Sequence, residues 1–182
     1  LGQLPVSCWD SADRLLEQKT YAEAKTQYQA ALKLKPGETY PAGKITEIDQ
    51  ALAELARLKD IDDRYQAAVK KADDLFGQKQ YTNARAEYTG ASVIKPSENY
   101  PASRIAEIDR ILGEIAAAKA LDDQYRGVVA KADQLLAAKD YTGARGEYEN
   151  AVKLKPAETY PPEKLAEISR ILADIEAEKL LA

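Results

Sequence analysis

The sequence predicts an all-α protein built from three tandem repeats of about sixty residues. First, a short motif returns at a fixed interval: LKPGETYP at 34–41, IKPSENYP at 94–101 and LKPAETYP at 154–161. Second, the apolar residues between these motifs recur three and four residues apart, which is the spacing of one helix face. Third, the junction 115–129 between two repeats contains no proline and only one glycine, so nothing there breaks a helix.

The repeats predict three domains, at 1–60, 61–120 and 121–182. The blocks share positions throughout their length, and most of the shared residues are suited to packing or to helix ends. These positions are Ala12/Ala72/Ala132, Leu15/Leu75/Leu135, Tyr21/Tyr81/Tyr141, Ala24/Ala84/Ala144, Tyr28/Tyr88/Tyr148, Ala31/Ala91/Ala151, Glu47/Glu107/Glu167 and Ile48/Ile108/Ile168, together with the proline, glutamate and Tyr-Pro of the motif.

The first two helices of a repeat are expected to form an antiparallel hairpin. In the second repeat, an apolar stripe at helical spacing predicts a helix within 62–77, and alternating alanine and tyrosine predict another from residue 81 to the motif. Only Gln78–Gln80 separate them, which is too short for any other arrangement. The small alanines would let the two backbones approach closely while the tyrosine rings fill the gaps beside them.

The motif itself indicates the end of one helix and the start of the next. Pro96 cannot continue the second helix, and Lys95 complements the negative end of its dipole. Pro101 suits the first position of the third helix, with Tyr100 as its N-cap. If the ring of Tyr100 is wedged between helices, Tyr100→Ala would cost about 2–4 kcal/mol and Pro101→Ala only about 0.5–1 kcal/mol. In the alternative, the Tyr-Pro corners bind a peptide through exposed Tyr40, Tyr100 and Tyr160.

The third helix, over 101–119, is expected to continue into the first helix of the next repeat. The resulting helix would have about 38 residues and a length of ~57 Å. Its apolar stripe changes phase along the way, from Ile105, Ile108 and Ile115 to Leu121 and Tyr125. A helix whose apolar face rotates packs against different partners at its two ends. This favours an elongated rod of three-helix bundles on shared helices, similar in principle to spectrin repeats; the alternative is a compact α-solenoid.

The first two helices of each repeat resemble a tetratricopeptide repeat. The match rests on its small-residue, aromatic and terminal-proline positions, which in the second repeat are Ala72, Tyr81, Ala84, Tyr88, Ala91 and Pro96. Three features depart from that family: the period is 60 rather than 34, Ala68 and Val128 replace its tryptophan, and Lys79 replaces its glycine. With the third helix added, the pattern resembles repeats of envelope-associated proteins of Bacteroidota. The resemblance implies a location in the bacterial cell envelope (periplasm or surface) and a structural or protein-binding role.

Composition argues against several functions. The net charge is −4 and no repeat is basic, so nucleic acid is not an expected partner. No apolar run reaches the length of a transmembrane helix. Histidine is absent and the glycines are scattered, so we expect no catalytic residue, cofactor or metal. The acidic pairs Asp62–Asp63, Asp73–Asp74 and Asp122–Asp123 are interpreted as solvated helix faces, or as acidic residues at a helix start if the helix is broken at the junction between repeats.

Four further residue types receive structural interpretations. The single cysteine, Cys8, is either the end of a degraded lipobox LPVSC, with Pro5 where leucine is wanted, or a thiol buried in the first helix. Trp9 is expected to cover the open end of the first bundle. A further set is assigned to the surface and carboxyl end of each first helix: Asp13/Asp73/Asp133 and Lys19/Lys79/Lys139.

The leading functional hypothesis is a non-enzymatic structural spacer or scaffold within a larger bacterial envelope protein. The shared positions are almost all packing, corner and capping residues, whereas a binding site would stand out as polar or aromatic residues that break the repeat. The alternative is a tetratricopeptide-like module for protein–protein interaction with an unknown protein partner. Its groove would be lined by residues of the second helices, such as Arg85, Glu87, Arg145 and Glu147.

Overall fold

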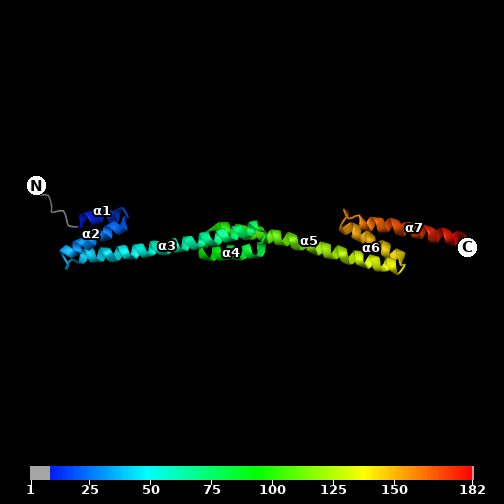
Figure 1. Ribbon diagram of the computed structural model, residues 1–182, viewed down its shortest axis with the longest axis horizontal. Helices are drawn as coiled ribbons and strands as arrows, with labels where there is room; N and C mark the ends of the chain where they lie inside the picture. The colour runs from blue at the N-terminus through cyan, green and yellow to red at the C-terminus, as the bar shows by residue number, and fades with distance from the viewer. Residues whose placement is uncertain (1–8, 182) are drawn as a thin grey trace. The chain divides into compact units, whose positions relative to one another are not determined.

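The computed structural model describes residues 9–181, and within this range the chain forms seven helices and no strand. The prediction of an all-α protein is therefore confirmed. Cys8 and the segment LPVSC lie outside the described residues. None of the helices in this range combines the length and the apolar character needed to cross a membrane. The helices are α1 (Asp10–Glu17), α2 (Tyr21–Leu34), α3 (Thr39–Gly77), α4 (Tyr81–Ile94), α5 (Asn99–Ala137), α6 (Tyr141–Leu154) and α7 (Tyr160–Leu181) (Figure 1).

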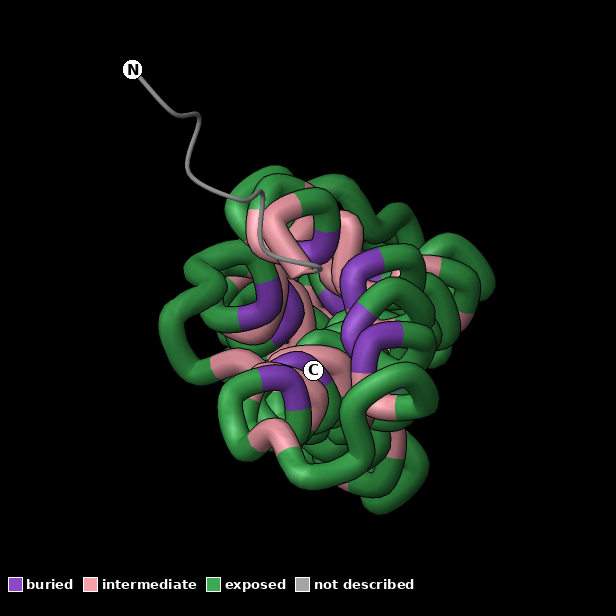
Figure 2. The backbone as a smooth tube through the Cα atoms, turned by 90° about the vertical axis from the view of Figure 1, so that its left-hand side faces the viewer, coloured by how far each residue is buried: buried purple, intermediate pink, exposed green. Residues whose placement is uncertain are grey.

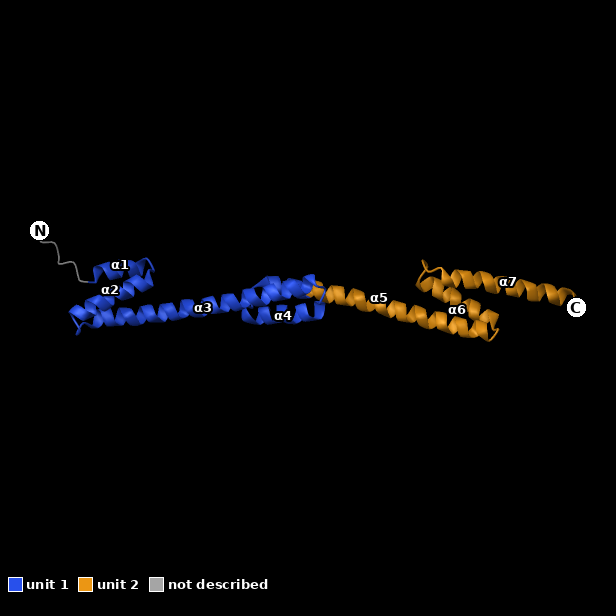
Figure 3. Cartoon of the chain, in the orientation of Figure 1, with its two compact units in different colours: residues 1–105 blue, residues 106–182 orange. Residues whose placement is uncertain are grey.

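The chain divides into two compact units, residues 1–105 and 106–182 (Figure 3). In the first unit, α1 packs on α2, α2 packs on the early part of α3, and α4 packs on α3 as well. In the second unit, α6 packs on α7. Helix α5 begins in the first unit and ends in the second.

The core of the first repeat combines residues from three helices. Ala12 of α1, Ala24 and Tyr28 of α2, and Ile48 of α3 are completely buried together. Half-buried side chains surround them: Trp9, Leu15, Leu16, Tyr21, Ile45 and Leu52. The equivalent cluster of the second unit contains Ala132, Ala144, Tyr148 and Ile168. Figure 2 shows that the buried stretches are short and separated by exposed ones, since each helix presents only a narrow face to the core.

The turn between the first two helices is closed by a lysine in the left-handed conformation. Lys79 has a φ of 60°, and Lys19 and Lys139 have φ values of 57° and 61°. The N–H of Lys79 donates to the carbonyl of Phe76, and the N–H of Gln80 donates to the carbonyl of Leu75, both at 2.9 Å. This bonding pattern defines a Schellman motif, where glycine is the usual residue. The expected link at Gln78–Gln80 is confirmed, because α3 ends at Gly77 and α4 begins at Tyr81.

The KPxE part of the motif is a four-residue turn. Helix α4 ends at Ile94, and the N–H of Glu98 then donates to the carbonyl of Lys95 at 3.2 Å. Pro96 therefore occupies the second position of the turn, for which its fixed φ is suited. The same bond forms after α2 and α6, at 3.3 and 3.2 Å. The predicted helix end before each Lys-Pro is confirmed.

The YP part of the motif differs from the prediction. Helices α3 and α5 begin one residue before their tyrosine, so Tyr40 and Tyr100 are helical rather than N-caps; Tyr160 is the first residue of α7. The prolines are consequently the second or third residue of their helices. They are tolerated there because none of the first four N–H groups of a helix has an intrahelical acceptor. Pro41, Pro101 and Pro161 are also completely buried, which the sequence pattern did not predict.

Helix α3 is continuous for 39 residues and passes through a stretch without tertiary cover. All residues from 53 to 60 are exposed, between a first part that packs in the first repeat and a last part that packs on α4. Ion pairs between residues one helical turn apart lie along this stretch and just beyond it: Glu54–Arg57 at 2.7 Å, Lys59–Asp63 at 2.5 Å and Asp60–Arg64 at 3.7 Å. Each stabilises an exposed helix by a few tenths of a kcal/mol. The continuous helix expected from the unbroken sequence is present in α3.

The burial of the YP proline revises the expected effect of its substitution. Pro101→Ala removes two buried methylenes and loosens the unfolded chain, which together should destabilise the protein by about 2 kcal/mol. Pro96→Ala changes an exposed turn residue and should cost only about 0.4–1 kcal/mol. Urea denaturation of both variants measures the difference; equal costs would mean that burial of the Pro101 ring contributes nothing.

Candidate functional site: a tyrosine–aspartate cluster in each repeat

The most distinctive polar feature of the structure is an aspartate that accepts two tyrosine hydroxyls. In the second repeat, Oδ1 of Asp73 on α3 accepts hydrogen bonds from Tyr88 of α4 and from Tyr100 in the first turn of α5, the latter at 2.8 Å. Tyr88 is completely buried, whereas Tyr100 is 44% exposed. One carboxylate thus joins three helical segments that are far apart in the sequence.

The same cluster forms in the other two repeats. Asp13 accepts from buried Tyr28 and, at 2.9 Å, from Tyr40. In the second unit, Asp133 accepts from Tyr148 at 2.5 Å and from Tyr160 at 2.9 Å. The two rings of each cluster meet edge to face, with centroids 6.1 to 6.4 Å apart. We refer to these three sets as the tyrosine–aspartate clusters.

These contacts correct three expectations. Tyr100 is not a buried wedge; it lies at the surface with its hydroxyl turned inward to Asp73. The shared aspartates do more than face solvent from the first helix, because each is the acceptor for a buried phenol. For the same reason, Asp73 is not part of a solvated acidic pair.

The environment keeps the phenols protonated. Burial raises the pKa of Tyr28, Tyr88 and Tyr148, and the hydrogen bond to the neighbouring carboxylate raises it further. For Tyr88, the guanidinium of Arg104, whose Nε lies 3.3 Å from the phenol oxygen, acts in the opposite direction. Each tyrosine therefore donates a hydrogen bond and does not act as a base. Each aspartate carboxylate accepts that hydrogen bond.

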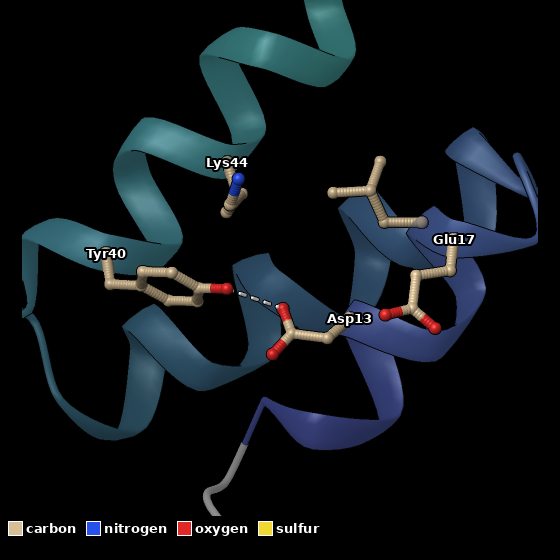
Figure 4. A pocket seen from close by; sticks show the side chains of 5 residues that line it. Asp13, Glu17, Tyr40 and Lys44 are labelled. Atoms are coloured by element: carbon tan, nitrogen blue, oxygen red, sulfur yellow. Dashed lines mark hydrogen bonds between the residues drawn. The ribbon is translucent and has the colours of Figure 1, made fainter.

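The first cluster borders a small open cavity of about 280 Å³ (Figure 4). Its lining residues are Asp13, Leu16, Glu17, Tyr40 and Lys44. Lys44 Nζ lies 5.7 Å from the centre of the Tyr40 ring and 2.7 Å from a Glu47 oxygen. Within residues 9–181, no group of three potential metal ligands is close enough together to hold an ion.

The repeats differ at the positions that line this cavity. Phe76 and Gly77 replace Leu16 and Glu17 in the second repeat, and the guanidinium of Arg104 lies 3.9 Å from the centre of the Phe76 ring. In the third repeat, Leu136 and Ala137 stand at the same two positions. The aspartate and the two tyrosines are thus constant, whereas the residues beside them vary.

A second recurring contact joins the end of one helix to the preceding long helix. Lys95 forms an ion pair with Asp62, and its Nζ lies 5.2 Å from the centre of the Tyr65 ring. Lys155 likewise pairs with Asp122 at 2.5 Å and lies 5.2 Å from the ring of Tyr125. The bond from Lys155 lowers the pKa of the Asp122 carboxyl. Asp62 and Asp122 were interpreted as residues of a solvated helix face. Each in fact forms an ion pair with a lysine at the end of another helix, which corrects that interpretation.

The residues predicted to line a groove lie on the hairpins. Glu87 pairs with Lys71 across α4 and α3 at 2.6 Å, and Glu147 pairs with Lys131 at 2.5 Å. Arg145 pairs with Glu149 on its own helix at 3.1 Å, and Arg85 is exposed on α4. Their role in binding a partner stays a prediction. Tyr40, Tyr100 and Tyr160 are brought into the tyrosine–aspartate clusters.

Comparison of the sequence with models of known protein families gave no match, and neither did comparison with curated proteins.

Asp73→Ala tests the importance of the cluster for stability. It leaves the buried hydroxyl of Tyr88 without its carboxylate and should cost about 2–4 kcal/mol, because hydrogen bonds to a charged group are worth about 1.5–3 kcal/mol each. Asp74→Ala removes only the exposed pair with Lys70 and should cost about 0.3–0.5 kcal/mol. Urea denaturation measures both. Adding Tyr88→Phe should cost less in the Asp73→Ala background than in the parent; additive costs would show that the two groups are not coupled.

Stability should also fall at alkaline pH. The unfolded tyrosine ionises near pH 10, whereas Tyr88 in the folded protein keeps its proton to higher pH. The unfolded state thus binds fewer protons above pH 10, and the stability contributed by Tyr88 is lost as the pH rises. Between pH 9 and 11, the stability advantage of the parent over Tyr88→Phe should shrink by on the order of 1 kcal/mol. Parallel pH curves for the two proteins would contradict this account.

Proposed function

We propose that this chain is a non-enzymatic spacer or scaffold of helical repeats, and that it works as part of a larger protein of the bacterial cell envelope. The observation that carries the proposal is α3. This single helix holds the first bundle at one end and the hairpin with α4 at the other, with exposed residues 53–60 between them.

The length of α3 supports a spacing role. Ile48, in the core of the first repeat, and Ala72, buried on the last part of α3, are 24 positions apart, which corresponds to ~36 Å of helix. An α-helix fixes distance and direction, whereas a loop of equal length would fix neither. The ion pairs of Glu54, Lys59 and Asp60 favour the helical state where tertiary contacts are missing.

The polar groups of the clusters favour a structural over a catalytic role. Each shared aspartate accepts two phenols, and each phenol has its pKa raised away from neutrality. Groups that satisfy one another in this way hold helices together. We further propose that three-helix bundles on shared helices give the whole chain an elongated form, with the compact α-solenoid as the alternative. The envelope location rests on the resemblance described above.

The second candidate function is a tetratricopeptide-like module that binds a protein or peptide. The half-exposed rings of Tyr40, Tyr100 and Tyr160 favour it, since exposed aromatic rings are frequent anchors at interfaces. The cavity beside Asp13 and Glu17 adds a recess next to one of these rings. The binding residues on the hairpins would include Arg85 and Arg145.

Small-angle scattering tests the spacer. A rod of three repeats should have a maximum dimension of about 100 Å or more, and deletion of residues 61–120, one full period, should shorten it by ~36 Å. A dimension near 60 Å, or no shortening, would overturn the spacer. A stoichiometric partner from envelope extract that is lost on Arg85→Ala and Arg145→Ala would favour the binding module.

A further inference from the structure

The three repeats carry equivalent surfaces at the carboxyl end of their second helix, and two of these surfaces are covered. Lys95 and Lys155 each bind an aspartate and lie over a tyrosine ring of the preceding long helix. Their side chains are only 25% and 24% exposed. The apolar residue before each lysine, Ile94 or Leu154, is half buried. Leu154 also lines a cleft of about 330 Å³ together with Val128.

In the first repeat, the two residues that correspond to this surface are exposed. Leu34 is 79% exposed, and the side chain of Lys35 is 62% exposed, with Glu38 4.0 Å away as its ion-pair partner. In the repeat alignment, Gly2 and Pro5 stand where the covered repeats have their aspartate and tyrosine. Neither residue has a carboxylate or an aromatic ring, so these two positions cannot provide the chemistry that covers Lys95 and Lys155.

We propose that Leu34 and Lys35 form a docking surface for a helix from another polypeptide that carries an aspartate and, three residues later, a tyrosine. The carboxylate would pair with the ammonium of Lys35, the ring would lie beside its methylenes, and apolar residues of the same helix face would cover Leu34. The two internal junctions show how this chemistry fits the surface, as Asp62 with Tyr65 and Asp122 with Tyr125.

Spacing and charge indicate that the docking segment is a helix. An aspartate and a residue three positions later lie on the same side of an α-helix, one turn apart, as they do in α3 and α5. Lys35 provides the positive charge and Leu34 the apolar contact that such a face requires. The turn formed by Lys35 and Glu38 is the same as in the covered repeats, with a hydrogen bond of 3.3 Å from the Glu38 N–H to the Lys35 carbonyl. The backbone of this surface therefore has the same conformation as in the other two repeats.

The probe is a peptide of residues 112–128 (LGEIAAAKALDDQYRGV) with blocked ends, added to the full chain at low salt. Amide NMR signals of Leu34 and Lys35 should shift saturably, with a Kd below about 1 mM. Those of Leu154 and Lys155, whose surface is already covered, should not move. Lys35→Glu should weaken binding roughly 3- to 10-fold, since it removes one ion pair and one contact between a cation and a ring.

A charge exchange separates specific docking from general attraction. Asp122→Lys in the peptide should weaken its binding to the parent protein and restore its binding to the Lys35→Glu variant. Lys19→Glu changes the net charge equally at the other end of the hairpin and should leave the Kd unchanged. Binding that does not saturate below ~2 mM, or equal shifts with the Asp122→Lys and parent peptides, would overturn the proposal.

Discussion

A buried phenol needs a hydrogen-bond acceptor, and this requirement organises every repeat. Tyr28, Tyr88 and Tyr148 fill the space between alanine-lined helices and have no exposed surface. An unpaired hydroxyl in that position would cost about 1–3 kcal/mol. The aspartate of the first helix meets the need, and its second tyrosine brings in the start of the third helix. One carboxylate thereby fixes the positions of three helices relative to one another. It also fixes the corner before the third helix, where the buried proline packs.

The clusters explain how long helices can have a stretch without cover. Residues 53–60 of α3 contact no core, and isolated helices of that length are not stable in water. The stretch is helical because the chain on both sides is fixed, by the cluster of Asp13 at one end and that of Asp73 at the other. The ion pairs then add a smaller contribution. Tertiary order at the ends and local charge in the middle together maintain one continuous helix.

Periodicity and turn chemistry predicted the helices well, whereas they did not predict contacts between residues far apart in the sequence. The ends of α2, α4 and α6 follow from Lys-Pro, and the hairpin link follows from its length. The partner of Asp73 was missed because Tyr88 and Tyr100 are 15 and 27 residues away, and helical spacing relates only near neighbours. A signal did exist, since the aspartate and both tyrosines are identical in all three repeats. The left-handed Lys79 replaces a glycine, so it could not be identified from residue type.

The exposed part of α3 has a mechanical consequence. When a chain is pulled from its ends, segments without tertiary contacts yield first, and 53–60 is such a segment. Its eight residues span ~12 Å as a helix and would span about 27 Å when extended. The tyrosine–aspartate clusters on either side would keep their bundles closed during this change. Such a helix would lengthen under load and shorten again when the load is released, and so act as an elastic element between the first bundle and the hairpin with α4.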